Sequence, residues 1–343
     1  MSSWTREQLC NLGRIFLRPF YGGIGCIVCL HRIVPKDDLS ANAENRALEI
    51  TPGGLRAILE WVRRRGLDVI RIDEVRQRLA EPRGKKFIVF TFDDGYRDNL
   101  TQALPIFRDF GMPFAVNVTT GFISRSTSVW WYSLEDALTG RPALRFEWES
   151  QPREYLLETH EDRMRAFGEL STLIRAQGRT TRDDLIARIC AAGSVDPLAR
   201  TRELMLTWDE LKQMVGDWHV NIGSHSQGHY DLNKLTQEEV EEELIDACAE
   251  LEAKLDFPVR HVAYPFGGAN AVGRREFEVA SAAEFTTATT TRCGNLFHEH
   301  AWNLLALPRL GLSGNYPPLL RLRNLESGLV PAKENKWKRI VVE

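Results

Sequence analysis

Residues 85–99 read KKFIVFTFDDGYRDN, and the fold can be worked out from this stretch. The apolar run 87–92 predicts a buried β-strand, because near-continuous apolar strands are typical of parallel sheets covered on both faces. Asp93 and Asp94 follow the strand directly, and Gly95 permits a sharp turn. Sites in α/β proteins are built at the carboxyl ends of strands, so these carboxylates are candidate functional residues. A solvated turn that contains the letters DDG is the alternative.

Further strand-like segments alternate with amphipathic helices along the chain. One helix is predicted to begin at the cap Thr51, and another at the capping box formed by Thr236 and Glu239. This alternation favours an α/β fold with a parallel sheet, either a barrel or a doubly wound sheet. Residues from about 125 to 203 break the alternation and predict a mainly helical insertion. The expected strands are residues 25–31, 68–72, 87–92, 114–119, 219–224, 259–264, 285–290 and 307–312.

The charge and the ends of the chain limit the possible partners and compartment. A net charge of −3 over 343 residues gives no signal for binding nucleic acid. The longest apolar stretch, residues 22–30, is about half the ~20 residues that a membrane span needs. Arg14 and Arg18 interrupt the apolar positions near the N-terminus, so no signal peptide is read and a cytoplasmic location is expected. Residues 1–24 are expected to form a helical segment and residues 323–343 a basic tail.

The N-terminal segment has an apolar helical face that allows two interpretations. Trp4, Leu9, Leu12, Ile15 and Phe16 share this face. A helix that docks onto the rest of the protein is the simpler interpretation. A helix in peripheral contact with a membrane is the other, and basic residues around Trp337 would suit the same surface. The sequence does not predict an oligomeric state.

Cys26 and Cys29 form a C-x-x-C pattern inside the first predicted strand. The chain holds six cysteines, too few for a disulfide scaffold. Residues i and i+3 of a strand face opposite sides, which disfavours joint redox or zinc chemistry. We therefore expect core thiols, in keeping with a cytoplasmic protein.

The segment HVNIGSHSQGHYDL, residues 219–232, supplies metal-ligand candidates. His225 and His229 are four residues apart, so on a helical turn their rings share one face. One carboxylate of the Asp pair would complete three protein ligands, and three ligands with an open position are typical of catalytic zinc sites. The other carboxylate is then a candidate general base. Two independent surface histidines are the alternative.

Two more strand exits carry candidate groups. Pro265 and Gly267 in the sequence YPFG fix a tight turn that can aim a backbone N–H into a site. His31 ends the first predicted strand. A lone histidine there is usually structural, but the other candidates also follow strands.

Together these motifs resemble a known family. TFDDG (91–95), the H-x-x-x-H of HSQGH (225–229) and YPFG (264–267) are similar to the signature motifs of polysaccharide deacetylases with a NodB-type homology domain, carbohydrate esterase family four. The resemblance covers residues 25–125 and 204–312. It implies a distorted (β/α) barrel of about seven parallel strands over residues 25–322. It also implies a divalent metal, most often Zn²⁺, with Co²⁺ or Ni²⁺ also possible.

The resemblance also implies roles for individual residues. Asp94, His225 and His229 correspond to the metal ligands, and Asp93 corresponds to the base. The backbone N–H of Phe266 would help to stabilise an oxyanion. The expected oxyanion or substrate-binding residues are Tyr96, Tyr264, Pro265 and Phe266.

The sequence departs from the usual family pattern in two places. No leucine-rich C-terminal strand carries an acid histidine, since His298 and His300 lie in a loop-like segment. VCLHRI (28–33) instead resembles the permuted branch, which includes deacetylases of poly-N-acetylglucosamine and implies His31 as the acid. Ala263 stands where many relatives place an arginine that orients the base, and Arg260 is a candidate replacement.

The function implied is metal-dependent removal of acetyl groups from N-acetylated sugars of a polysaccharide or its lipid-linked precursor. A carbohydrate O-acetyl esterase at the same site is one alternative. A carbohydrate-binding pseudoenzyme, with the aromatic residues 130–132 stacked on sugars, is another. Phosphoryl transfer with Asp93 as nucleophile is disfavoured, because imidazole ligands suit zinc-like metals better than Mg²⁺.

Overall fold

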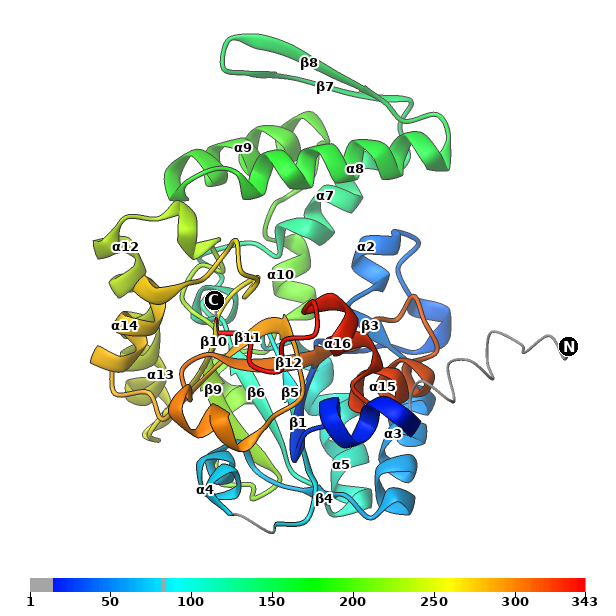
Figure 1. Cartoon of the computed structure of the whole chain (residues 1–343). Coiled ribbons are helices and arrows are strands. Elements are labelled where there is room, and N and C mark those ends of the chain that lie inside the picture. Colours follow the sequence, from blue (N-terminus) through cyan, green and yellow to red (C-terminus); the bar gives the residue numbers. More distant parts are fainter. Residues whose placement is uncertain (1–14, 82–83, 343) are drawn as a thin grey trace, which may run out of the picture.

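The computed structural model describes residues 15–81 and 84–342, and its centre is a closed barrel of seven parallel strands (Figure 1). Neighbouring strands follow the order β1-β12-β11-β10-β9-β6-β5, and β5 pairs with β1 to close the ring. The expected barrel is confirmed. The barrel strands are β1 (Gly25–Leu30), β5 (Phe87–Phe92), β6 (Phe114–Val118), β9 (Val220–Ser224), β10 (His261–Ala263), β11 (Thr287–Cys293) and β12 (Leu307–Gly311).

The strand registers determine which residues lie side by side at the carboxyl end of the barrel. β1 and β5 pair along their whole length, ending at Leu30 opposite Phe92. Consequently His31 and Asp93, the next residue of each strand, emerge side by side. In the same way β6 and β9 end together, and the N–H of His225 donates to the carbonyl of Val118 at 2.8 Å. β4 (Asp68–Val69) pairs with the start of β5 and lies outside the ring.

Helices pack around the outside of the barrel, as the apolar periodicity predicts. In α3 (Pro52–Arg65) the side chain of Thr51 caps the N–H of Gly54, and the inward positions 55, 58, 59 and 62 are buried. The other larger outer helices are α4 (Val75–Ala80), α5 (Leu104–Phe110), α13 (Ala247–Leu255), α14 (Arg274–Ala282) and α15 (Pro318–Glu326). The short elements are β2 (Arg32–Ile33), η1 (Lys36–Asp38), α2 (Ala43–Arg46), β3 (Glu49–Ile50), η2 (Ile72–Glu74), η3 (Asn99–Ala103), α6 (Thr120–Ile123), α11 (Trp208–Lys212), η4 (Leu232–Lys234), α12 (Gln237–Glu241), η5 (Glu242–Asp246), η6 (His298–Trp302) and α16 (Leu329–Glu334).

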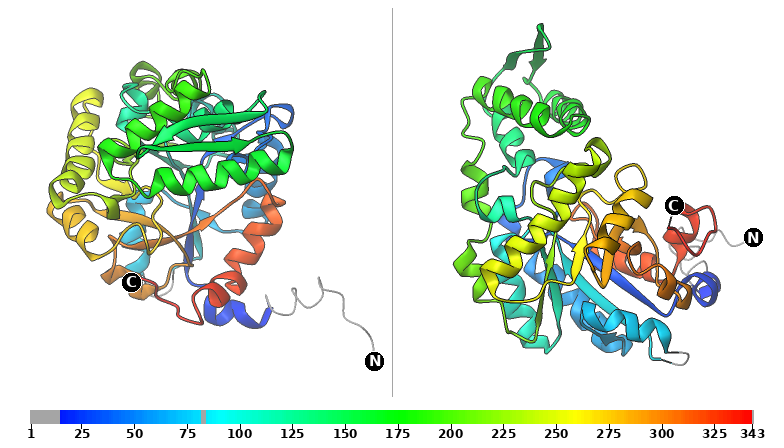
Figure 2. Two further views of the ribbon diagram at one scale, coloured as in Figure 1. Left: turned by 90° about the horizontal axis from the view of Figure 1, so that it is seen from above. Right: turned by 90° about the vertical axis from the view of Figure 1, so that its left-hand side faces the viewer.

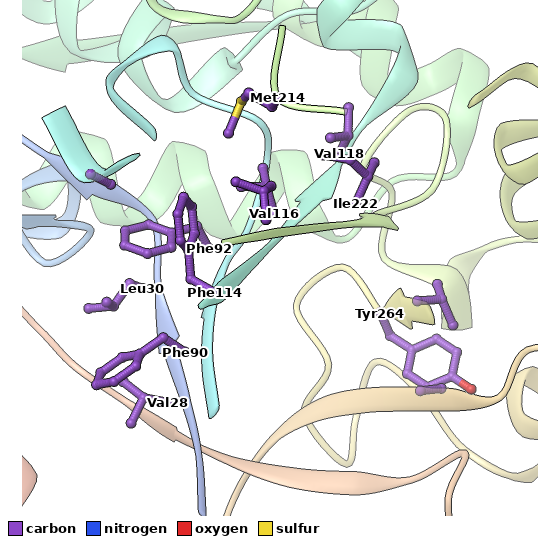
Figure 3. Close-up of a cluster of buried hydrophobic side chains, with 14 of the residues drawn as sticks. Val28, Leu30, Phe90, Phe92, Phe114, Val116, Val118, Met214, Ile222 and Tyr264 are labelled. Carbon is purple, nitrogen blue, oxygen red and sulfur yellow. The ribbon is translucent and has the colours of Figure 1, made fainter. Parts of the chain in front are cut away.

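The main hydrophobic core lies between the strands and these outer helices (Figure 3). Phe90 and Phe92 of β5 point into it, and the rings of Phe107 and Phe114 stack there with centroids 4.5 Å apart. Alternate residues of the same strand face the barrel interior, because side chains alternate along a strand. Cys26 belongs to this outer core, whereas Cys29 bonds to Asp93 on the other face of β1, as the spacing predicts.

The insertion between β6 and β9 forms a second packed unit with its own apolar cluster. Figures 1 and 2 show that its helices lie over part of the barrel end where the strands finish. The sequence did not predict its hairpin, in which one strand packs its apolar side on a helix while the other is largely exposed. Its elements are α7 (Trp130–Leu138), β7 (Ala143–Trp148), β8 (Gln151–Leu156), α8 (His160–Arg175), α9 (Arg179–Ala192) and α10 (Ala199–Leu204).

The two ends of the chain differ in part from expectation. Residues 15–21 are helical, while Trp4, Leu9 and Leu12 lie outside the described residues. The boundary expected after residue 322 falls inside α15, and α16 follows with Ala332 fully buried, because this segment packs on the barrel. Within the described residues, none of the helices combines the length and apolar character needed to cross a bilayer.

Candidate active site

Asp94, His225 and His229 gather at the end of the barrel below the insertion. Their potential ligand atoms all lie within 4.8 Å of one another, and all three side chains are buried. The Nε2 atoms of His225 and His229 lie 3.4 and 3.3 Å from Asp94 Oδ1. The expected helical turn is wrong, because residues 225–229 form a loop in which His229 adopts a left-handed φ of 53°. The loop still brings the two rings to a centroid distance of 5.0 Å.

Hydrogen bonding around this trio fits a divalent cation. His225 Nδ1 lies 2.6 Å from the carbonyl of Ala263 and donates to it, which leaves the Nε2 lone pair facing Asp94. Apart from the Nε2 atoms of His225 and His229, the buried Asp94 Oδ1 has no hydrogen-bond donor among the described residues. A buried carboxylate oxygen without a partner is costly unless a cation compensates it. Two imidazoles and a carboxylate are ligands that zinc accepts.

The protonation of Asp94 agrees with a ligand role. Burial alone would raise its pKa, but the imidazoles of His225 and His229 hold the pKa well below its usual range. Asp94 is therefore ionised. Its φ of 77° is rare for a residue with a side chain, and such a conformation costs about 1–3 kcal/mol. The surrounding structure accordingly holds Asp94 in this position.

Two charged residues hold the loop that carries His229. Arg182 of α9, in the insertion, donates to the carbonyls of Gly228 at 3.1 Å and His229 at 2.9 Å. Glu243 of η5 accepts hydrogen bonds from the N–H groups of Gln227 at 3.1 Å and Gly228 at 2.7 Å. The insertion and an outer helix of the barrel together fix the loop conformation.

Asp93 is held by a set of donors that the sequence reading missed. The guanidinium of Arg309 on β12 contacts both carboxylate oxygens, at 2.8 and 2.7 Å, and Asn117 Nδ2 donates to Oδ1 at 2.8 Å. The thiol of Cys29 lies 3.4 Å from Oδ2. Burial alone would raise the pKa of Asp93, but Arg309 and His225 lower it. Asp93 is therefore an oriented, ionised carboxylate.

The candidate Arg260 does not hold the base. It lies at the surface and pairs with Glu252 at 2.9 Å, because its side chain points away from the barrel interior. The sequence did contain a signal for Arg309, which stands in the middle of a predicted buried strand. A cation in such a place needs a buried anionic partner, and Asp93 is that partner.

His31 lies at the exit of β1 and lines the same pocket as Asp93 and Asp94. Its Nδ1 is buried with no hydrogen-bond partner in the described parts of the chain, and burial lowers its pKa. His298 and His300 do not line this pocket, and His298 Nδ1 lies 2.7 Å from the carbonyl of Leu79. Of the histidines considered as a proton donor, only His31 is therefore in place.

Cys29, His31 and Asp93 form a second close group but a poor metal site. Their potential ligand atoms also lie within 4.8 Å. Burial raises the pKa of the Cys29 thiol well above its usual value, so the thiolate that a metal prefers is disfavoured. The oxygens of Asp93 are already engaged by Arg309 and Asn117.

The four residues expected to contact an oxyanion or substrate take different positions. Phe266 has a φ of 58°, and its N–H donates no hydrogen bond within the described residues. Pro265 is buried beside it in the same turn. Tyr264 lines the pocket, but its hydroxyl donates to the carbonyl of Leu305 at 3.1 Å. Tyr96 is fully buried and accepts a hydrogen bond from Trp131 Nε1 at 3.1 Å, so it supports the wall of the pocket.

The pocket has a volume of about 240 Å³ and is shared by the barrel and the insertion. The insertion contributes an aromatic wall, in which the ring of Trp131 lies 5.2 Å from that of His229. Arg175 stacks over Phe266 at 4.3 Å. The insertion residues lining the pocket are Trp130, Trp131, Phe167, Ser171 and Arg175, and those from outside the motifs are Glu44, Asn45, Leu48 and Thr291.

Residues 80–287 match the family described as polysaccharide deacetylase, and the chain belongs to this family. A poly-beta-1,6-N-acetyl-D-glucosamine N-deacetylase of Escherichia coli (strain K12) is 33% identical over 73 residues. That match covers 21% of this chain and only 11% of the relative.

Solved structures share the fold at low sequence identity. The Streptococcus pyogenes deacetylase PplD in complex with acetate superposes with a TM-score of 0.55 and 18% identity, covering 86% of this chain and 95% of PplD. IcaB from Ammonifex degensii gives a TM-score of 0.53 and 17% identity, covering 88% of this chain and 97% of IcaB. At this level of identity the likeness concerns the fold alone.

Proposed function

We propose that this polysaccharide deacetylase family member is a metal-dependent N-deacetylase. It would remove acetyl groups from N-acetylated sugars of a polysaccharide or of its lipid-linked precursor. The observation that carries the proposal is the arrangement around Asp93. This carboxylate is held ionised by Arg309, beside the Asp94–His225–His229 trio and next to His31 at the adjoining strand exit. A base, a metal-ligand set and an acid candidate therefore open into one pocket.

Asp94, His225 and His229 would hold the divalent ion. When bound, such an ion acts as a Lewis acid and lowers the pKa of water toward ~7. Zn²⁺ suits two imidazoles and one carboxylate best, and Co²⁺ or Ni²⁺ would fit the same ligands.

Asp93 and His31 would carry out different proton transfers. Asp93 accepts the proton of the attacking water. Its hydrogen bonds to Arg309 and Asn117 fix the orientation of the carboxylate. The uncommitted N–H of Phe266 donates to the oxyanion that forms, and one donor of an oxyanion hole is typically worth about 3–4 kcal/mol. His31, once protonated, gives its proton to the departing amine. Its lowered pKa makes the protonated ring a stronger acid.

The position of His31 ahead of Asp93 supports placing the chain in the permuted branch of the family. The base and acid lie on adjacent strands β5 and β1, so their order along the chain does not alter their geometry. This intact set of residues speaks against a carbohydrate-binding pseudoenzyme. An O-acetyl ester remains the second candidate substrate, because the same oxyanion contact would serve it.

The size and lining of the pocket favour one acylated sugar unit at a time. Its 240 Å³ is below the ~300–1,000 Å³ typical of pockets for drug-sized ligands. Aromatic side chains on one wall and polar groups on the others suit a sugar ring, which has apolar faces and a polar rim.

The experiment is acetate release from chito-oligosaccharides and from a UDP-linked or lipid-linked N-acetylhexosamine. Each would be incubated with zinc or cobalt, beside a chelated sample and the Asp93→Asn variant. Release that requires both metal and Asp93 supports the proposal, and the preferred acceptor separates polymer from precursor. Metal binding through His225 and His229 without release from any N-acetyl substrate would contradict it, and O-acetylated sugars would then be assayed.

A further inference from the structure

The N-terminal helical segment, residues 15–21, presents apolar side chains to solvent on one side. Ile15, Phe16 and Phe20 expose 68%, 69% and 66% of their surfaces. The other side of the segment is fixed to the barrel, since Arg18 pairs with the buried Glu326 at 3.2 Å and Asn295 donates to the carbonyl of Tyr21 at 2.9 Å. The exposed apolar side therefore belongs to an anchored helix.

A fourth exposed apolar side chain, that of Trp337, lies beside this helix. Trp337 is 60% exposed, and its ring packs edge-on against Tyr21 with centroids 5.8 Å apart. Figure 1 shows the helix, in dark blue, next to the red C-terminal helices α15 and α16. Large apolar and aromatic side chains on one surface are typical of segments that enter the headgroup region of a bilayer.

Basic side chains surround these apolar residues. Arg65 and Arg323 line a surface hollow beside Ile15, and Lys336 and Lys338 flank Trp337. Glu326, the one carboxylate among the described residues lining that hollow, is buried and already contacts both Arg18 and Lys86. The hollow therefore carries a net positive charge, and near Trp337 the two lysines outnumber the exposed Glu334. We call the whole surface the N-terminal patch: Ile15, Phe16, Phe20, Trp337, Arg65, Arg323, Lys336 and Lys338.

We propose that the N-terminal patch docks the protein onto an anionic bilayer surface. The apolar side chains enter the interface while the arginines and lysines contact lipid phosphates. The charge argues against a second copy as the occupant, because a two-fold contact between identical patches brings like charges together. This docking is independent of the proposed catalytic function.

The test is co-sedimentation of the full chain with vesicles of phosphatidylcholine alone or mixed with phosphatidylglycerol. We expect binding to the anionic vesicles that weakens as salt is added. The variant Phe16→Ser/Phe20→Ser should bind about tenfold less or weaker still, because it loses the apolar contact. Lys336→Glu/Lys338→Glu should lower binding to the anionic vesicles only.

Leu156→Ser is the matched control. Leu156 is 55% exposed on β8, at the opposite end of the molecule (Figure 1), so its replacement should leave vesicle binding unchanged. All substituted side chains are exposed, and thermal melting would verify that each variant is folded. Absence of binding to any vesicle, or unchanged binding by the double Phe variant, would overturn the proposal. A dimer in ultracentrifugation that the double Phe variant abolishes would assign the patch to self-association instead.

Discussion

The barrel and the insertion bury different kinds of side chains. The barrel interior and its upper end enclose charged groups, among them Arg309, Asp93 and His225, each paired with another polar group. The insertion encloses an aromatic and aliphatic cluster that includes Trp131 and Phe167. The barrel therefore supplies the candidate catalytic and metal-binding groups, and the insertion supplies the aromatic wall of the pocket. Arg182 is the exception, because it reaches from the insertion to the loop of a candidate ligand.

His31→Ala should give the largest effect, a loss of about 10²–10⁴ in turnover, because general acid catalysis typically contributes that much. The ligand trio does not include His31, so bound metal measured by elemental analysis should remain stoichiometric. The measurement is the rate of acetate release at saturating substrate. His298→Ala, outside the pocket, serves as the control. Near wild-type turnover by His31→Ala would remove this residue from the mechanism.

Arg309→Met should be the next largest change and should affect both stability and activity. Breaking a buried ion pair on one side costs about 3–5 kcal/mol, because the other charge remains buried. Chemical denaturation would measure this loss. Arg260→Met, which removes an exposed pair with Glu252, should cost less than about 1 kcal/mol.

The same variant should change the dependence of activity on pH. In the proposed mechanism Asp93 acts in its ionised form, and Arg309 opposes the effect of burial on its pKa. Without Arg309 the pKa of Asp93 rises, so activity should be lost at a higher pH as the solution is acidified. A pH–rate profile whose acid limb is unmoved would show that Arg309 is merely structural.

These residues also show what the sequence could and could not predict. The positions of His31 and Asp93 at the ends of strands were predictable. Because the carboxyl ends of parallel strands lie at the same edge of a sheet, both residues lie at that edge. The partner of Asp93 was not, since Arg309 is 216 positions away and only the closed order of strands brings them together. An arginine in a predicted buried strand indicates a buried anionic partner. Identifying that partner as Asp93 required knowledge of which strands are neighbours in the barrel. The hairpin after α7 was missed although residues 144–148 (LRFEW) alternate between apolar and charged side chains, because its second strand, QPREYL, contains a proline and has no such alternation.

Arg182→Ala would test a buried link from the insertion to the loop that carries His229. Loss of its bonds to the carbonyls of Gly228 and His229 should let the loop relax and lower metal affinity about 10- to 100-fold, as for other groups that support metal ligands. Competition with a chelator would measure the affinity. Arg188→Ala is the control, because this exposed residue of the same helix pairs with Asp184 and does not contact the loop. Unchanged affinity in the first variant would mean that Glu243 holds the loop alone.

Glu154→Ala should have the smallest effect and completes the comparison between ion pairs. Arg145 and Glu154 contact at 2.8 Å across the hairpin, a distance close to those between Arg309 and Asp93, although only one oxygen of Glu154 is engaged. The hairpin pair is 71% and 50% exposed, however, whereas the barrel pair is buried. Water already solvates the hairpin charges, so stability should change by less than about 0.5 kcal/mol and acetate release should not change. A loss comparable to that of Arg309→Met would mean that the hairpin, despite its exposure, is coupled to the barrel.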